Sequence, residues 1–192
     1  MLVGAILAGG ESRRMGKPKV GMSLPSGLQM GTHLVQILEG MTDLQVVVGW
    51  PQDVPKLHSA LTLMDEKPDA GPLSGLTTLL ASQLGTRYLI LPCDMPLIRP
   101  QLLERLLASE EPACVFQSDD QFLHPLPLVL EPSALDVARR CLHSPDRSLR
   151  SFLSQIDTKQ ISITPKQARE LRSFNTPDAF QALFDEIRSA AE

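Results

Sequence analysis

Short aliphatic runs alternate along the chain with longer amphipathic stretches. Short aliphatic runs, each bounded by glycine, proline or charged residues, predict strands at Leu2–Leu7, Leu44–Val48, Leu61–Met64, Tyr88–Leu91 and Ala113–Phe116. Longer amphipathic stretches predict helices at Thr32–Leu38, Leu73–Leu84 and Pro100–Ala108. Strands that alternate with helices are typical of a mostly parallel sheet covered on both faces, so the pattern favours an α/β fold.

The pattern changes beyond Gln117, but no linker, internal repeat or low-complexity tract interrupts it. It predicts strands at His124–Leu130 and Ile161–Ile163 and helices at Ser133–Leu142, Ser148–Ile156 and Thr176–Ala190. In the last helix, Thr176 suits the N-cap and Pro177 the first position. Because 192 residues suffice for one well-packed domain, we expect residues 1–192 to form a single domain.

Composition narrows the classes of function. No apolar run approaches the roughly 18–20 residues that a membrane span needs, and Met1–Ile6 lacks the features of a signal peptide, so we expect a soluble, cytoplasmic protein that does not bind membranes. The three cysteines, Cys93, Cys114 and Cys141, lie far apart, which favours buried free thiols over a zinc site or disulfides. The net charge is −4 and no basic block follows the opening loop, so a nucleic-acid surface is not expected.

The opening loop contains the first candidate ligand-binding residues. It reads "LAGGESRRMGKPK" and follows the first predicted strand, where open α/β folds bind ligands. Gly9 and Gly10 allow backbone N–H groups to approach an anion closely. Positive charge for a polyphosphate comes from Arg13, Arg14, Lys17 and Lys19. The stretch matches neither GxxxxGK[ST] nor GxGxxG, and a tight turn before a solvated basic helix is the alternative.

Two carboxylates follow other predicted strands. In "LPCDMP", Asp94 stands at a strand end, where Mg²⁺ can be held by a carboxylate and phosphate oxygens; the alternative is that Asp94 caps the helix near Pro100. In "DEKPDAGPLSGL", Asp65 can accept both hydrogen bonds from the paired donor edge of guanine, which other bases lack. Gly71 then begins a helix whose first N–H groups suit an anion. A turn with solvated acids is the alternative for this segment.

These motifs resemble those of the nucleotidyltransferases. The opening loop is similar to the family signature LAGGxSxRMGxxK, and its GG form is typical of the molybdenum cofactor guanylyltransferases, which join GMP from GTP to the phosphate of molybdopterin. The resemblance implies a three-layer α/β/α Rossmann-like nucleotidyltransferase fold with a mostly parallel central sheet. It also implies GTP and molybdopterin as substrates, Mg²⁺ as cofactor, and transient contact with other cofactor-biosynthesis proteins or with molybdoenzymes.

The resemblance assigns roles to individual residues. Lys19 matches the signature lysine that contacts the phosphates, Arg14 matches the arginine of RMG, and Asp94 matches the aspartate that binds Mg²⁺ and nucleotide in the CDxP motif. These three residues are the expected catalytic residues. The expected nucleotide-binding residues are Leu7, Ala8, Gly9, Gly10, Lys19, Asp65, Gly71 and Asp94.

Later elements resemble the parts of the family that lie near the phosphates and the pterin. "FNTPDAF" is similar to NxNTPEDL, whose asparagine lies near the metal and phosphates; Asn175 matches its second asparagine, whereas Ser173 replaces the first. "HPLPLVL" and "DRSLRSFL" resemble the segment that faces the pterin, which implicates His124, Arg147 and Arg150. A packed histidine and solvated arginines are the alternative for those residues.

The chain departs from the family after the second predicted strand, where Gly49, Trp50 and Pro51 stand in place of an asparagine that often contacts the nucleotide. A cytidylyltransferase acting on the same cofactor is one alternative function, but that branch typically reads LAAG and DQP where this chain has LAGG and DMP. A non-catalytic nucleotide-binding protein of the same fold is the alternative from another class. The motifs favour transfer of GMP to molybdopterin, with pyrophosphate as the leaving group.

Overall fold

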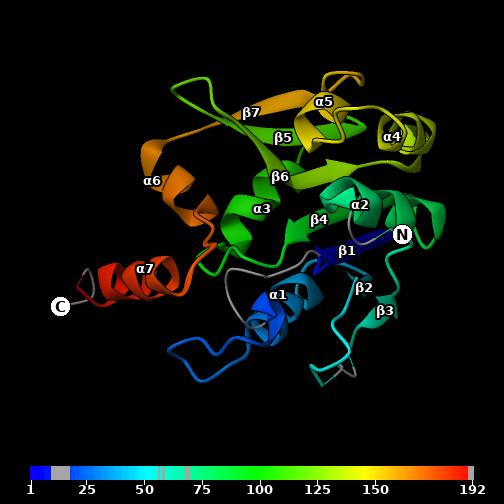
Figure 1. The fold of residues 1–192 in the computed structure, drawn as a ribbon. Coiled ribbons are helices and arrows are strands. Elements are labelled where there is room, and N and C mark those ends of the chain that lie inside the picture. Colours follow the sequence, from blue (N-terminus) through cyan, green and yellow to red (C-terminus); the bar gives the residue numbers. More distant parts are fainter. Residues whose placement is uncertain (10–17, 56, 58, 68–69, 190–192) are drawn as a thin grey trace.

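The computed structural model describes residues 1–9, 18–55, 57, 59–67 and 70–189. In this part of the chain, seven strands form one sheet in the order β3-β2-β1-β4-β6-β5-β7 (Figure 1). The strands are β1 (Leu2–Leu7), β2 (Leu44–Val48), β3 (Leu61–Leu63), β4 (Arg87–Pro92), β5 (Ala113–Ser118), β6 (Leu123–Leu130) and β7 (Lys159–Ile163). Only β6 runs antiparallel to its neighbours among these strands, so the prediction of a mostly parallel sheet is confirmed.

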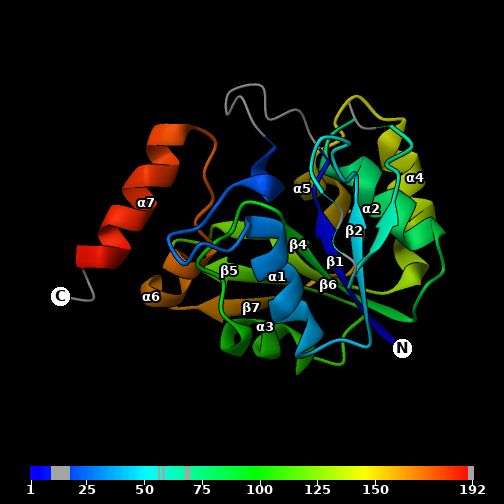
Figure 2. The same cartoon turned by 90° about the horizontal axis from the view of Figure 1, so that it is seen from below.

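Helices cover both faces of the sheet (Figures 1 and 2). One face packs against α1 (Met30–Glu39), α3 (Pro100–Leu107), α6 (Pro165–Ala168), the 3₁₀ helix η4 (Arg169–Leu171) and α7 (Pro177–Ser189). The other face packs against the 3₁₀ helix η3 (Pro132–Ala134), α2 (Pro72–Ala81), α4 (Leu135–Leu142) and α5 (Leu149–Leu153). The layers are therefore α/β/α, as expected.

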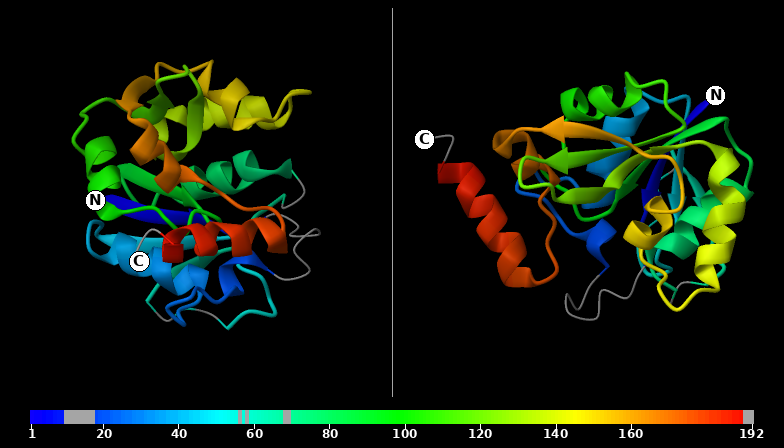
Figure 3. Two further views of the ribbon diagram at one scale, coloured as in Figure 1. Left: turned by 90° about the vertical axis from the view of Figure 1, so that its left-hand side faces the viewer. Right: turned by 90° about the horizontal axis from the view of Figure 1, so that it is seen from above.

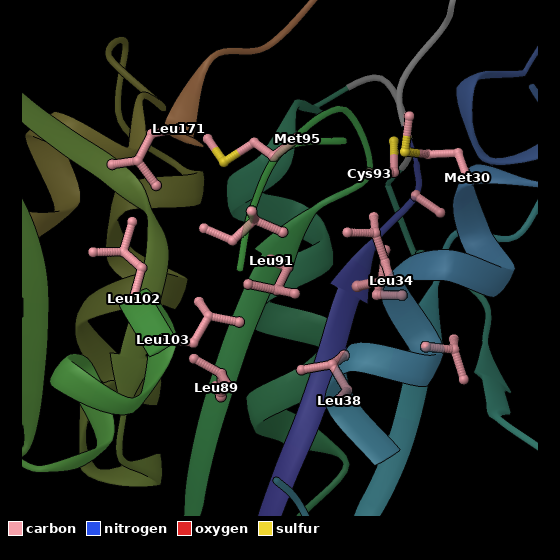
Figure 4. Packing of buried hydrophobic residues seen from close by; sticks show 14 of the residues in the cluster. Met30, Leu34, Leu38, Leu89, Leu91, Cys93, Met95, Leu102, Leu103 and Leu171 are labelled. Atoms are coloured by element: carbon pink, nitrogen blue, oxygen red, sulfur yellow. The ribbon is translucent and has the colours of Figure 1, made fainter. Parts of the chain in front are cut away.

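Alternate residues of the central strands pack into different layers, because successive side chains of a strand point to opposite faces. In β4, Leu89 and Leu91 belong to the core beneath α1 and α3, whereas Tyr88 and Ile90 belong to the core beneath α2, α4 and α5. Figure 4 shows Leu89 and Leu91 beside the leucines of α3. Burial on both faces explains why these strands read as continuous apolar runs.

Helix boundaries differ from the predicted ones for local reasons. Helix α2 ends at Ala81 and not at Leu84, because Gln83 has a φ of 53°, which a right-handed helix does not accommodate. Helix α6 was not predicted because it is too short to show a helical repeat of hydrophobic residues. A capping box between Thr164 and Gln167 marks its start. None of the described helices is both long enough and apolar enough to cross a lipid bilayer.

Helix α7 projects from the side of the molecule opposite the N-terminus (Figure 3). Thr176 caps it by accepting a hydrogen bond from the N–H of Ala179 at 3.2 Å, as predicted. Phe184 of α7 and Phe174, which precedes the helix, are buried in the core on the α1 side. The start of α7 and the residues before it therefore pack onto the face of the sheet that α1 and α3 cover.

Leu103 of α3 is fully buried against the sheet. Leu103→Ala should lower the free energy of unfolding by about 2–5 kcal/mol, because it removes buried methyl groups and leaves a cavity. Urea unfolding followed by circular dichroism measures the change. Leu61→Ala is the control, because Leu61 is 43% exposed, and it should change the free energy by about 0.5 kcal/mol at most. Equal losses in the two variants would contradict the packing described here.

Candidate active site

Three neighbouring parallel strands end at one edge of the sheet. The register pairs Leu7 at the end of β1 with Val48 of β2 and with Pro92 of β4. Residues that follow these positions, Ala8, Gly49 and Asp94, therefore lie in adjacent loops. Open α/β sheets bind ligands at this edge because the loops there are free to carry functional groups.

The backbone after β1 lies directly against the backbone after β2. The N–H groups of Ala8 and Gly9 both donate to the carbonyl oxygen of Val48, at 2.9 and 3.2 Å. Gly49 has a φ of +76°, and a Cβ at this position would lie 2.7 Å from the Cα of Gly9. The N–H of Gly9 is thus already bonded to Val48. The backbone of Gly9 is nevertheless exposed and carries no side chain, so a ligand can approach it closely.

Several predicted residues of the opening loop lie outside the described part of the chain. They are Gly10, Arg13, Arg14 and Lys17. The roles predicted for Gly10 and Arg14 stay predictions.

Lys19 joins two predicted site residues that are far away in the sequence. Its Nζ donates to Oδ2 of Asp94 at 2.9 Å and to Oδ1 of Asn175 at 2.8 Å, and it lies 5.4 Å from the centre of the Phe174 ring. The side chains of Lys19 and Asp94 are only 13% and 18% exposed. Helix α3 has Arg99 at its N-cap, without a side-chain cap, so the alternative that Asp94 caps this helix is wrong.

The two oxygens that meet Lys19 form a donor set suited to a hard divalent ion. Magnesium prefers carboxylate and amide oxygens together with phosphate oxygens and water. Asp94 and Asn175 turn a carboxylate oxygen and an amide oxygen toward one cationic nitrogen. No group of three or more His, Cys, Asp or Glu side chains that could hold a metal occurs in the described residues. A metal at Asp94 would therefore depend on oxygens of the ligand as well.

The thiol of Cys93, next to this carboxylate, is buried. Burial, reinforced by the charge of Asp94, raises the pKa of Cys93 to about 12. Cys93 is therefore a neutral thiol at physiological pH. Cys93, Cys114 and Cys141 are all free and buried, as predicted.

Asp65 is held in a fixed orientation after β3. Its Oδ1 accepts hydrogen bonds from the hydroxyl of Ser74 at 2.5 Å and from the N–H of Lys67 at 3.0 Å. Its Oδ2 faces the β1 loop, because a Cβ built on Gly9 would lie 3.3 Å from that oxygen. Of the alternative, a turn with solvated acids, the turn and the exposed Glu66 are present, whereas Asp65 itself is half-buried and hydrogen-bonded beside the predicted nucleotide loop.

Helix α2 starts at the same edge of the sheet. Gly71 has a φ of +77° and stands at the N-cap without a side chain, and Pro72 occupies the first position. Pro72 has no N–H, and the N–H of Ser74 donates to the carbonyl oxygen of Gly71 at 3.1 Å, so of these first three positions only Leu73 could direct an N–H to an anion. Pro72 also lines a cavity that reaches Asp94, so the start of α2 faces the candidate site.

A cavity of about 680 Å³ opens beside Asp94 and is large enough for an organic ligand. Its apolar lining comes from Pro72, Pro92, Met95, Phe122, Pro125, Leu126, Leu149, Ala168 and Leu171. Its polar groups come from Asp94, His124, Ser148, Arg150, Arg172 and Ser173. Arg147 is exposed and lies outside this lining. The structure thus places His124 and Arg150 in one cavity with Asp94, whereas Arg147, next in sequence to Ser148 of the lining, is not part of it.

An aromatic ring stands at the wall of the cavity. Phe122 is 48% exposed, and the guanidinium of Arg150 lies over its ring, 4.4 Å from the centre. Arg150 also donates to the carbonyl oxygen of Leu123 at 2.8 Å, and the ring of His124 meets Phe122 edge-on. Sequence analysis missed Phe122. The signal available was an aromatic residue in an otherwise polar hairpin turn, "SDDQF".

The turn between β5 and β6 fixes this ring in place. The carboxylate of Asp120 accepts hydrogen bonds from the hydroxyl of Ser118 at 2.7 Å and from the N–H of Phe122 at 3.1 Å. The same hydroxyl lies 3.2 Å from Nε2 of His124. The turn therefore holds the ring and the imidazole as one unit.

Known proteins share this architecture. Residues 4–161 match the model of the MobA-like NTP transferase domain. The chain belongs to the MobA-like NTP transferase family. The molybdenum cofactor guanylyltransferase of Xanthomonas euvesicatoria pv. vesicatoria is 33% identical over 188 residues, which covers 95% of this chain and 94% of the relative. That of Shewanella baltica is 28% identical over 187 residues and covers 95% of both chains.

A solved structure has the same fold. Molybdopterin-guanine dinucleotide biosynthesis protein A from Archaeoglobus fulgidus superposes with a TM-score of 0.76 at 21% identity, covering 99% of this chain and 100% of that one. The nucleotidyltransferase fold implied by the motifs is therefore confirmed.

The hydrogen-bonded turn at Asp120 predicts how the pKa of His124 responds to a mutation. Burial lowers the pKa of His124 below its usual value; the carboxylate of Asp120 opposes this shift and Arg150 adds to it. Asp120→Asn should lower the pKa of His124 further, because it removes the charge that favours the imidazolium while keeping a hydrogen-bond acceptor. An NMR titration of the His124 ring measures the shift. Asp119→Asn, at an exposed neighbour, is the control and should move the pKa less. An unchanged or higher pKa in Asp120→Asn would count against this arrangement.

Proposed function

We propose that this protein transfers GMP from GTP to the phosphate of molybdopterin and releases pyrophosphate. The observation that carries the proposal is the meeting of Lys19, Asp94 and Asn175 at the ligand-binding edge of the sheet, beside a cavity lined mainly by apolar residues. The guanylyltransferases of Xanthomonas and Shewanella, which align along nearly the whole chain, support the assignment.

The reaction needs no protein nucleophile. A phosphate oxygen of the acceptor attacks the α-phosphorus of GTP in line, and a new phosphorus–oxygen bond forms. The bond to pyrophosphate breaks, and pyrophosphate leaves with the bonding electrons. The protein contributes position and charge, which are the main sources of catalysis in such transfers.

Charged residues of the chain have distinct roles in this scheme. We assign Lys19 and Arg14 to the phosphates, where they stabilise the leaving pyrophosphate. Asp94, with Asn175 beside it, would hold the metal, and Mg²⁺ offsets the charge of the triphosphate when bound. A Mycobacterium tuberculosis protein of this fold, with a TM-score of 0.70 and 16% identity, was solved in complex with manganese. That structure is a precedent for a divalent ion in the fold.

We assign the nucleotide to the edge between β1 and β2. Leu7, Ala8, Gly9 and Gly10 would line its site. Because the N–H groups of Ala8 and Gly9 donate to Val48, the exposed backbone face of Gly9 would be the point of contact. Gly71 would bring the start of α2 to its phosphates. Asp65 would accept hydrogen bonds from the guanine edge, since Ser74 and Lys67 already hold its carboxylate in orientation. This arrangement makes guanine preference depend on one fixed carboxylate.

Steady-state rates with GTP, CTP and ATP test the function and the base site together. Pyrophosphate release with Mg²⁺ and molybdopterin should give a higher kcat/KM for GTP than for the other nucleotides. Asp65→Asn should reduce that preference about tenfold or more, because the new amide keeps the size but turns a donor toward donors of guanine.

Asp94→Asn is the companion variant and should abolish release with every nucleotide. A wild type that uses CTP as well as GTP would contradict the guanylyltransferase assignment, and no release at all would favour a non-catalytic nucleotide-binding protein. An unchanged preference in Asp65→Asn would exclude Asp65 from the base site.

We assign the acceptor to the cavity beside Asp94. A pterin is a flat heterocycle, and Phe122 offers a ring for it to stack on, while Arg150 and His124 supply polar contacts. Arg147, exposed outside the cavity, would reach only a group that projects from it. The cavity joins these residues to Asp94, so the acceptor's phosphate would lie near the nucleotide.

Phe122→Leu tests this assignment. It should raise the KM for molybdopterin about two- to tenfold, the range expected for loss of an aromatic contact worth about 0.5–1.5 kcal/mol. The KM for GTP should stay the same. Leu28→Ala, at an exposed apolar residue outside the cavity, is the control and should change neither value. A rise in the KM for GTP alone would place Phe122 on the nucleotide side.

Three further assignments accompany this function. We propose that residues 1–192 act as one nucleotidyltransferase domain, because β6 and β7 complete the same sheet as β1. We also propose a cytoplasmic site of action, where GTP is available. Transient contact with proteins that make or receive the cofactor stays a prediction from the sequence.

A further inference from the structure

One ammonium group occupies the point where two candidate metal ligands converge. Oδ2 of Asp94 and Oδ1 of Asn175 both accept from Nζ of Lys19, at 2.9 and 2.8 Å. We propose that Lys19 competes with the divalent metal for these oxygens, and that the nucleotide's phosphates draw Lys19 away so that the metal is loaded together with the nucleotide. This inference rests on the proposed function, because it assigns Lys19 and Asp94 to the same phosphate site.

Electrostatic repulsion sets the two cations in competition. The ammonium occupies Oδ2 of Asp94 and Oδ1 of Asn175, and a divalent ion that approached the same carboxylate, even through its other oxygen, would lie close to this positive charge. Lys19 and Asp94 are largely buried, so water and salt screen the repulsion between an ammonium and a divalent ion only weakly. The metal therefore binds well only after the ammonium has moved.

Lys19 can move away while the backbone that carries Asn175 stays in place. A lysine carries its charge on a flexible four-carbon stem, so its ammonium can exchange a carboxylate for a phosphate. Asn175 lies between Phe174, which is 1% exposed, and Thr176, which caps α7. Its backbone is thus fixed on both sides. Asn175 is a positioning residue in the free protein, since its amide oxygen holds the ammonium beside Asp94.

The exchange has a consequence for the order of binding. Without nucleotide, the negative charge of Asp94 is already neutralised, and the free protein has low affinity for the metal. A triphosphate supplies new acceptors for Lys19 and new oxygens for the metal in one step. Metal affinity therefore rises when nucleotide binds, and by linkage nucleotide affinity rises with metal.

Binding of Mn²⁺ to the full-length protein, followed by electron paramagnetic resonance, tests the exchange without any turnover. In the absence of nucleotide, Lys19→Met should bind Mn²⁺ about tenfold more tightly than wild type, because the stem is kept and the competing charge is removed. Lys19→Arg should bind as weakly as wild type. A non-hydrolysable GTP analogue should tighten Mn²⁺ binding to wild type and narrow its difference from Lys19→Met.

Matched variants separate this effect from general ones. Lys159→Met makes the same change in net charge at an exposed position of β7 and should bind Mn²⁺ as wild type does. Asp94→Asn combined with Lys19→Met should lose the tighter binding, which assigns it to this carboxylate. Lys19→Gln serves as the uncharged variant if Lys19→Met does not fold, as judged by circular dichroism.

The outcomes distinguish this inference from the proposed function. Lys19→Met binding Mn²⁺ no more tightly than wild type without nucleotide would overturn the exchange, even if GMP transfer is observed. Tighter binding to Lys19→Met would support the exchange even if the wild type transferred no GMP, in which case the proposed function alone would fail.

Discussion

The parallel pairing of β1 with β2 and β4 is the constraint on which the candidate site depends. Parallel neighbours end at the same edge of a sheet, so loops from distant parts of the sequence meet there without any requirement on the loops themselves. The register of Leu7 with Val48 and Pro92 sets how far each loop reaches. Because both faces of these strands are buried, a slip of one residue would exchange the two cores, and the register is firmly specified.

The two ends of the site present different environments, which match two different substrates. The edge near Lys19 and Asp94 carries charge and hydrogen-bonding groups, as a polyphosphate requires. The cavity that extends to Phe122 is lined mainly by apolar side chains, as a flat heterocycle requires. Asp94 belongs to both, since it contacts Lys19 and lines the cavity. The reacting phosphates would therefore meet where the polar and apolar parts of the site join.

Sequence patterns predicted the strands well because each strand is a compact apolar run buried by tertiary packing on both faces. Asp65 and Asp94 were also predictable, since each follows a strand at the edge where ligands bind. The pairing of Lys19 with Asn175 could not be predicted from local patterns, because 156 positions separate the two residues and no repeat relates them. Asn175 was a candidate only through the resemblance to a family. Phe122 was missed because its exposure depends on the turn and on Arg150, which are properties of the assembled fold.

The close approach of Gly9 and Gly49 couples the loop that follows β1 to the loop that follows β2. Asparagine tolerates a positive φ better than most residues, but its Cβ at position 49 would still meet the Cα of Gly9 at 2.7 Å. An asparagine at position 49 can therefore be accommodated only if the β1 loop retreats. The two loops are therefore sterically coupled, because any side chain at position 49 requires a matching shift of the backbone at Gly9.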